Sequence, residues 1–140
     1  MELNEYQDKA MQTCLPSSKN FSYMMLNLMG EVGEFSSKVA KAIRKEQMSI
    51  GEVPVKGEEP EWQKNKHFYN MTEEDAKPLE DGLKKEAGDI LWQLSGLCTV
   101  MGWTLEEVAQ MNLGKLQARK QAGTINGSGD GISGESRKAE

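Results

Sequence analysis

The sequence is poor in cysteine and histidine, and this scarcity excludes several kinds of metal site. Its 140 residues include two cysteines, Cys14 and Cys98, and a single histidine, His67. The cysteines lie far apart and form no CxxC zinc pattern, and one histidine cannot supply the two ExxH pairs of a di-iron helical bundle. Both cysteines fall on predicted apolar helix faces, which favours buried free thiols over a disulfide and points to a reducing, cytoplasmic environment.

Long hydrophobic runs are also missing. No segment approaches the roughly 18 consecutive apolar residues that a membrane-spanning helix needs, and the acidic start, Met1–Glu5, lacks the regions of a signal peptide. We therefore expect no membrane partner. Hydrophobic residues make up only 37% of the chain, and the mean hydropathy is −0.65. So polar a chain would gain from burying more surface against a partner subunit, which predicts oligomerisation.

Positive charge is in deficit. Lysine and arginine total 17 against 22 acidic residues, which gives a net charge of −5. Proteins that coat DNA or RNA usually present a basic surface, so no nucleic-acid polymer is expected as a partner. A nucleotide substrate stays possible, because a bound metal ion can supply the positive charge that the protein lacks.

The apolar residues recur with helical periodicity almost throughout, and no strand signal is found. Pro16 ends the first predicted helix, Pro78 begins the third, and Thr104–Glu107 forms a capping box for the fourth. The prediction is an all-α bundle of four to five helices, completed by oligomerisation, within a domain at residues 1–122. The predicted helices cover approximately residues 2–14, 20–45, 78–101 and 104–121.

Two segments break this pattern. The connection at about residues 46–78 holds three of the four prolines, and so long a loop is uncommon in a compact domain unless it is functional. It is either a functional flap or partly ordered by a cluster of its own residues: Trp62, His67, Phe68 and Tyr69. Trp62, Phe68 and Tyr69 are also candidates for stacking on a nucleobase, with local packing as the alternative. The tail at residues 123–140 is rich in Gly and Ser, which predicts mobility, or order only against a ligand or partner.

Two pairs of acidic residues carry the clearest chemical signal. Glu31 and Glu34 share one helix edge because they are three residues apart, and Glu86 and Asp89 do the same. At roughly 100° per residue, each pair sits at the same offset from its helix's apolar stripe. If the two helices pack antiparallel, four carboxylates could therefore point into one cleft.

Four neighbouring carboxylates raise each other's pKa unless a cation neutralises them. Carboxylate oxygens suit Mg²⁺ or Mn²⁺, which predicts a metal site at Glu31, Glu34, Glu86 and Asp89. The alternative is that they are ordinary solvated charges flanking a core. Gly30, Gly33 and Gly88 adjoin the two pairs, and glycine costs about 1 kcal/mol inside a helix. Their presence suggests that something approaches this backbone closely.

The last predicted helix adds a second group of polar residues. Asn112 falls within its apolar stripe, where a buried amide needs hydrogen-bond partners, and Lys115 and Arg119 flank it as a possible phosphate-facing edge. A basic helix end that complements the helix dipole is the simpler explanation. Trp92, three residues after Asp89, either stacks on a nucleobase or is buried at a subunit interface.

Together these residues resemble the MazG-type all-α nucleoside triphosphate pyrophosphohydrolases, in particular the small single-domain members. The resemblance covers most of the chain except about residues 46–78. The matching segments are Glu5–Gln7, Glu31–Glu34, Glu86–Trp92, Asn112–Arg119 and Gly123–Asp130.

The resemblance implies a function and a set of roles. Family members convert NTPs or dNTPs to the monophosphate and pyrophosphate, often in nucleotide-pool cleaning, and work as dimers or tetramers. The four carboxylates would ligate Mg²⁺, while Asn112, Lys115 and Arg119 would contact metal or phosphate.

Site chemistry then predicts a metal-activated water that attacks a phosphorus atom. Glu34 is the candidate for accepting the proton of this water. Glu31 and Lys115 are the other two candidate catalytic residues, and Lys115 would stabilise the phosphates. A non-catalytic helical metal-binding or regulatory protein is the alternative, and within the superfamily so is a phosphoribosyl-ATP hydrolase.

Overall fold

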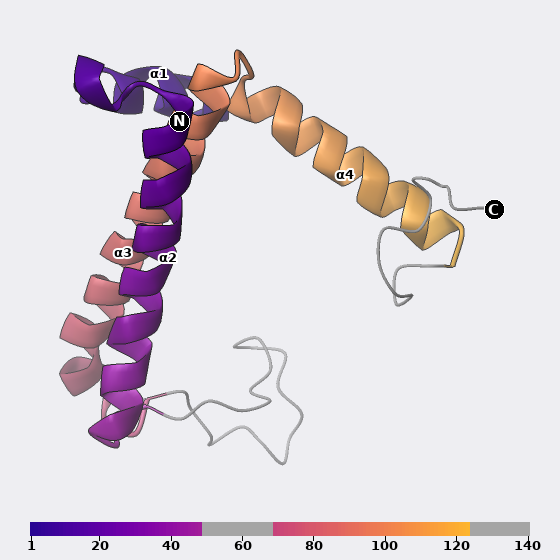
Figure 1. Ribbon diagram of the computed structural model, residues 1–140. Helices are drawn as coiled ribbons and strands as arrows, with labels where there is room; N and C mark the ends of the chain where they lie inside the picture. The colour runs from indigo at the N-terminus through magenta and orange to yellow at the C-terminus, as the bar shows by residue number, and fades with distance from the viewer. Residues whose placement is uncertain (49–68, 124–140) are drawn as a thin grey trace. The chain divides into compact units, whose positions relative to one another are not determined.

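The computed structural model describes residues 1–48 and 69–123. Within these ranges the chain is helical and its one β-type pairing is an isolated bridge between Met48 and Tyr69, which confirms the all-α prediction. Trp62, His67, Phe68 and the tail beyond residue 123 lie outside the described residues. In chain order the elements are α1 (Leu3–Met11), η1 (Pro16–Ser18), α2 (Phe21–Arg44), α3 (Glu73–Val100) and α4 (Leu105–Gln121) (Figure 1).

The bounds of α2 and α4 agree with the sequence because both helices begin at capping residues. The Asn20 side chain accepts a hydrogen bond from the Tyr23 backbone N–H at 2.8 Å. The Thr104 hydroxyl accepts a hydrogen bond from the Glu107 backbone N–H at 3.1 Å, and the Glu107 carboxylate accepts one from the Thr104 backbone N–H at 2.8 Å. These two hydrogen bonds form the predicted capping box. Helix α1 is shorter than expected, since it ends at Met11 rather than near residue 14.

The start of α3 was predicted wrongly. The helix begins at Glu73, and Pro78 lies inside it instead of opening it. The Thr72 hydroxyl accepts a hydrogen bond from the Asp75 backbone N–H at 3.1 Å. The first turn is acidic, and its negative charges interact favourably with the positive end of the helix dipole. These two stabilising effects extend the helix upstream of the proline, which itself removes one backbone hydrogen bond.

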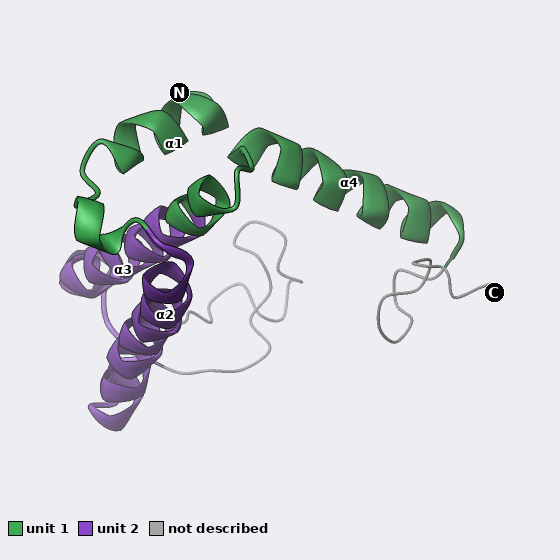
Figure 2. Ribbon diagram, turned by 45° about the horizontal axis from the view of Figure 1, so that its top comes forward, with its two compact units in different colours: residues 1–19, 95–140 green, residues 20–94 purple. Residues whose placement is uncertain are grey.

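The chain divides into two compact units (Figure 2). Unit 1 comprises residues 1–19 and 95–140, and unit 2 comprises residues 20–94. No described helix is both long enough and apolar enough to cross a membrane. Cys98 is buried and Cys14 is only half-buried, and both are free thiols.

Unit 1 is organised around the buried side chain of Gln7. Its amide nitrogen donates to the Thr99 hydroxyl at 3.0 Å and to the Trp103 carbonyl at 2.9 Å. Its amide oxygen accepts from the Leu105 backbone N–H at 2.8 Å. One side chain on α1 thereby satisfies backbone groups at the turn between α3 and α4 and at the first residue of α4.

Replacing Gln7 by Leu is expected to lower the free energy of unfolding by about 1–3 kcal/mol, because the Leu105 N–H and the Trp103 carbonyl lose their partner. Urea unfolding followed by circular dichroism measures the change. The exposed Gln12→Leu variant is the matched control and should stay within about 0.5 kcal/mol of the parent. Equal stability of the two variants would contradict the assigned role of Gln7.

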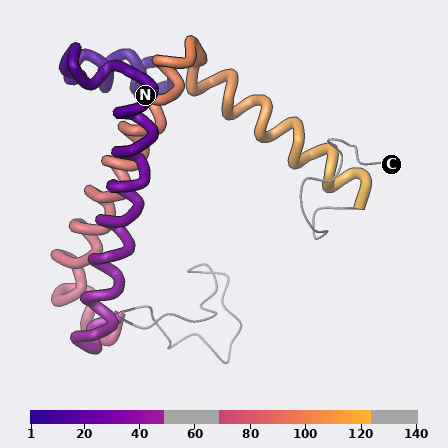
Figure 3. The backbone as a smooth tube through the Cα atoms, viewed as in Figure 1, coloured from indigo at the N-terminus to yellow at the C-terminus, as the bar shows by residue number. Residues whose placement is uncertain are grey.

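In unit 2, α2 and the first part of α3 lie side by side (Figures 1 and 2). Met24, Ala42, Ala76 and Leu83 are buried between them. At one end of the pair, the Asn70 backbone N–H donates to the Gln47 carbonyl at 2.9 Å, beside the Met48–Tyr69 bridge. The end of α2 and the approach to α3 are thus held together, as the tube view also shows (Figure 3).

Part of the predicted apolar stripe of α2 remains exposed. Its inner face contains Met24, Leu28, Glu31, Phe35, Val39 and Ala42, all buried or half-buried. In contrast, Phe21, Met25, Val32 and Ile43 are exposed within the described chain. The stripe is wider than one packed neighbour can cover, because a single neighbouring helix contacts only part of a helix surface.

Candidate metal centre

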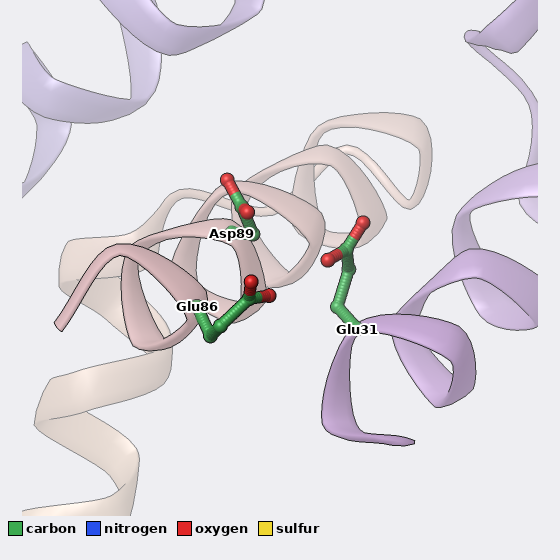
Figure 4. A group of neighbouring side chains, drawn as sticks. All are labelled: Glu31, Glu86 and Asp89. Carbon is green, nitrogen blue, oxygen red and sulfur yellow. The ribbon is translucent and has the colours of Figure 1, made fainter. Parts of the chain in front are cut away.

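Three of the four predicted carboxylates converge. Glu31 comes from α2, and Glu86 and Asp89 come from α3, one turn apart (Figure 4). Each offers one oxygen atom, and these atoms all lie within 4.8 Å of one another. The predicted juxtaposition of the two acidic pairs is therefore present for these three residues.

The two members of each pair occupy different environments. Glu31 and Glu86 lie on the inner faces of their helices and are half-buried, whereas Glu34 and Asp89 are exposed. A step of three residues turns the side chain by roughly 300°, so the second member rotates away from the helix interface. Asp89 still reaches the cluster, while Glu34 lies outside the group of three.

The electrostatics of Glu31 reflect this arrangement. Burial raises the pKa of its carboxyl, and the negative charges of Asp89, Glu86 and Glu34 raise it further. A hydrogen bond from Asn27 acts in the opposite direction. Glu34 thus lies close enough to influence Glu31, and the charges that act on this carboxyl are all negative.

A polar network behind Glu31 was not predicted from the sequence. The Asn27 amide donates to Glu31 at 3.4 Å and to the Gln93 side-chain oxygen at 2.8 Å. Gln93 is buried, and its own amide nitrogen donates to the Met24 carbonyl at 3.4 Å. Asn27 lies four residues before Glu31, and Gln93 seven after Glu86. Polar residues at core positions were the signal that could have revealed it.

Replacing Gln93 by Leu is expected to weaken Mg²⁺ binding about 10- to 100-fold, because Asn27 loses the partner that fixes its amide toward Glu31. The free energy of unfolding should also fall by about 1–3 kcal/mol. Calorimetric titration with Mg²⁺ and urea unfolding measure the two effects. Gln110→Leu, at an exposed position on α4, is the control. A loss of stability with unchanged Mg²⁺ affinity would restrict Gln93 to a structural role.

Lys38 is a third residue, after Asn27 and Gln93, that sequence reasoning missed. Its ammonium nitrogen lies 3.5 Å from a carboxylate oxygen of Glu86, whose side chain is only 15% exposed. Lys38 follows Glu31 by two helical turns on α2, a spacing that returns it to the inner face. It is the one cation that the described residues pair with a member of the cluster.

Comparison with known proteins identifies the family of this chain. The family model of the MazG nucleotide pyrophosphohydrolase domain matches residues 19–124. The chain belongs to the MazG nucleotide pyrophosphohydrolase family. A curated relative, the Gene 37 protein of Mycobacterium phage L5, is 31% identical over 137 residues, which span 93% of this chain and 98% of that protein. No solved structure matches significantly.

The cluster in this MazG chain fits a divalent cation by its donor chemistry. Three carboxylate oxygens from a rigid helix pair are the hard ligands that Mg²⁺ and Mn²⁺ prefer. Burial and the neighbouring charges of Asp89, Glu86 and Glu34 raise the pKa of Glu31, and a nearby cation would favour its ionised form. A cation bound to Glu31, Glu86 and Asp89 would relieve that repulsion.

The other predicted site residues are divided between the two units. Asn112, Lys115 and Arg119 are on α4 in unit 1, so their part in a site with the carboxylates stays a prediction. Asn112 is exposed in the single chain, contrary to its expected position in a buried stripe, because this face of α4 is itself exposed. Trp92 is half-buried in unit 2.

The glycines next to the acidic pairs do not mark a close approach within the chain. A Cβ atom added at Gly33 or Gly88 would meet nothing within 4 Å among the described residues. At Gly30 it would make only ordinary contact, 3.6 Å from the Asn27 side chain. The described part of the MazG chain therefore leaves open surface beside the carboxylates, and the expected close approach to this backbone stays a prediction for a ligand or a partner.

Proposed function

We propose that this MazG chain is a Mg²⁺-dependent nucleoside triphosphate pyrophosphohydrolase, which converts an NTP or dNTP to the monophosphate and pyrophosphate. The convergence of Glu31, Glu86 and Asp89 in a chain of this family carries the proposal. The domain is taken as residues 1–122, and nucleotide-pool control is the corresponding cellular role.

The carboxylates have distinct tasks in this proposal. Glu31, Glu86 and Asp89 hold the cation, with Glu34 as a further ligand or as the base that accepts the proton of the attacking water. When bound, Mg²⁺ supplies Lewis acidity, a more acidic water and neutralisation of the leaving pyrophosphate, and Mn²⁺ can substitute for it. Asn27 and Gln93 orient Glu31 through their hydrogen bonds.

The residues of α4 complete the proposal. Lys115 and Arg119 stabilise the triphosphate of the substrate by charge, and Asn112 contacts the metal or a phosphate. Because Asn112 and Lys115 are exposed on a helix with further exposed apolar residues, Met111, Leu113 and Leu116, they are available to a substrate or to a second copy of the chain.

Assembly into a homodimer or homotetramer belongs to the same proposal. The exposed apolar residues of α2 support it, since they line one side of the helix next to the carboxylates: Phe21, Met25, Leu26, Met29 and Val32. Burying each would contribute about 25 cal/mol per Å² of apolar surface. Trp92 is proposed to pack at the subunit interface or to stack on the base.

The test is a panel of NTPs and dNTPs with Mg²⁺, with released pyrophosphate measured by a coupled assay and the nucleotide product identified by chromatography. Monophosphate and pyrophosphate in equal amounts are expected. Orthophosphate as the sole inorganic product, or no turnover of any nucleotide, would contradict the proposal. Metal binding without turnover would support instead a non-catalytic metal-binding or regulatory protein.

A further inference from the structure

A basic groove lies next to the carboxylate cluster in unit 2. It is formed between the second half of α2, the residues that follow it and the beginning of α3, and its volume is about 370 Å³, within the usual range for small-ligand sites. We call it the lysine groove. Its lining includes three lysines, Lys38, Lys41 and Lys45, and its apolar part includes Ala42 and Leu79.

The charge of the groove contrasts with that of the protein. Lys38 and Lys41 lie on α2, and Lys45 is the capping residue that follows its last residue. Their spacings of three and four residues place them on one side of the helix over about 10 Å. Asp75 is the single acidic residue among the described residues of the lining, and these residues therefore have two net positive charges in a chain whose net charge is −5. Among the described residues, no ion pair engages Lys41 or Lys45.

The helix dipole does not account for all three lysines. Cations in the last turn of a helix stabilise its negative end, which would explain Lys41 and the neighbouring Arg44. Lys38 lies six residues before the end of α2, beyond the reach of that effect. Its ammonium nitrogen lies instead 3.5 Å from the carboxylate of Glu86.

This contact makes the groove continuous with the cluster. Gly82, one turn before Glu86 on α3, also lines the groove. A Cβ atom added to Gly82 would lie 3.8 Å from the Lys38 nitrogen. Lys38 therefore lies where the acidic cluster and the lysine groove meet. Its ammonium group contacts Glu86 of the cluster, and the residue also lines the groove.

We infer that the lysine groove binds the pyrophosphate portion of the substrate, the two terminal phosphates that become the leaving group. This inference rests on the proposed function and adds residues that the sequence comparison did not supply. Ammonium groups bind phosphate oxygens through short charge-assisted hydrogen bonds. A cation held by Glu31, Glu86 and Asp89 would supply counter-charge to Glu86, so the Lys38 ammonium would be available to phosphate.

The test uses inorganic pyrophosphate as the probe, with binding to the full chain measured by titration calorimetry in the presence of Mg²⁺. The K41Q and K45Q variants should each bind pyrophosphate about 10-fold more weakly, and the double variant about 100-fold. Lys84→Gln is the matched control, because Lys84 is 71% exposed, pairs with Glu80 and does not line the groove. It should bind as the parent does. The K41R/K45R variant, which keeps both positive charges, should bind pyrophosphate as the parent does. This comparison distinguishes loss of charge from loss of folding in the K41Q/K45Q variant.

The outcomes distinguish this inference from the proposed function. If the chain binds pyrophosphate through these lysines but hydrolyses no nucleotide, the groove assignment stands and the pyrophosphohydrolase proposal falls. If the chain hydrolyses a nucleotide and the folded K41Q/K45Q variant binds pyrophosphate like the parent, the groove assignment is overturned and the function stands. In an active enzyme, the double variant should also raise KM for the nucleotide by about 10-fold or more.

Discussion

Replacing Glu31 by Gln is expected to lower the rate of pyrophosphate release from the best nucleotide substrate by about 100-fold or more. Loss of a metal ligand removes several kcal/mol of transition-state stabilisation, and about 1.4 kcal/mol corresponds to each tenfold in rate. Asp89→Asn should have a similar effect, because Asp89 supplies the third oxygen of the same cluster. Initial rates at saturating Mg²⁺ measure both.

The same Glu31→Gln substitution should make the metal-free protein more stable. The pKa of Glu31 is raised by burial and by three neighbouring carboxylates, so its ionised form opposes folding. A glutamine side chain at this position would carry no charge and would retain an oxygen that can accept from Asn27. We expect a higher thermal midpoint for this variant in the presence of EDTA, together with a loss of turnover. Such a result would indicate that the negative charge of Glu31 serves function at the expense of stability.

Glu80→Gln is the control for both measurements. Glu80 is also on α3, but it pairs with Lys84 at the surface and is not a member of the cluster. It should leave turnover unchanged. A folded E31Q variant that releases pyrophosphate at the parent rate would overturn the assignment of the metal centre, as would equal losses in E31Q and E80Q.

Addition of Mg²⁺ is expected to raise the thermal midpoint of the parent protein, and by more at pH 7.5 than at pH 5. A ligand that binds only the folded state at 100 times its Kd stabilises by about 2.7 kcal/mol, which corresponds to roughly 5–15 °C for a domain of this size. Differential scanning calorimetry at several Mg²⁺ concentrations measures the shift.

The pH dependence follows from the direction of the Glu31 shift. Because its pKa in the folded state lies above the ordinary value of 4.5, its contribution to the stability of the metal-free protein is present below that value. The contribution is lost as the pH rises through the raised pKa. Mg²⁺ requires the ionised carboxylate and competes with the proton, so its stabilising effect grows over the same interval.

Two variants delimit this second prediction. E31Q and D89N should lose most of the Mg²⁺-dependent shift, while E80Q should keep it. A shift of the same size at pH 5 and pH 7.5, or one that survives in E31Q, would place the stabilising Mg²⁺ somewhere other than these carboxylates.

The helices and the acidic pairs could be read from the sequence because both depend on local periodicity and capping. Asn20 and Thr104 mark the starts of α2 and α4 by hydrogen bonds within a few residues. The early start of α3 was missed because Pro78 was given more weight than the cap at Thr72 and the acidic first turn. All of these effects act within one helix and are in principle legible from residue order.

Tertiary structure decided which of the acids act together. Periodicity placed Glu31 and Glu34, and likewise Glu86 and Asp89, at equal offsets, and it could not specify the rotation of each helix about its axis. Packing of α2 against α3 put Glu31 and Glu86 at the interface and left Glu34 outside the cluster. The partners Asn27, Gln93 and Lys38 became apparent only there, because hydrogen bonds and ion pairs between helices depend on their relative register.

The same helix packing determines how the few positive charges and the many negative charges are distributed over the fold. Residue order alone is enough to predict an all-α chain with an excess of acidic residues, some of them paired at helical spacing. The fold concentrated three of those acids within 4.8 Å and lined up three lysines beside them. Charge counts are properties of residue order, whereas the separation of acidic and basic groups into adjacent sites depends on which helix faces meet.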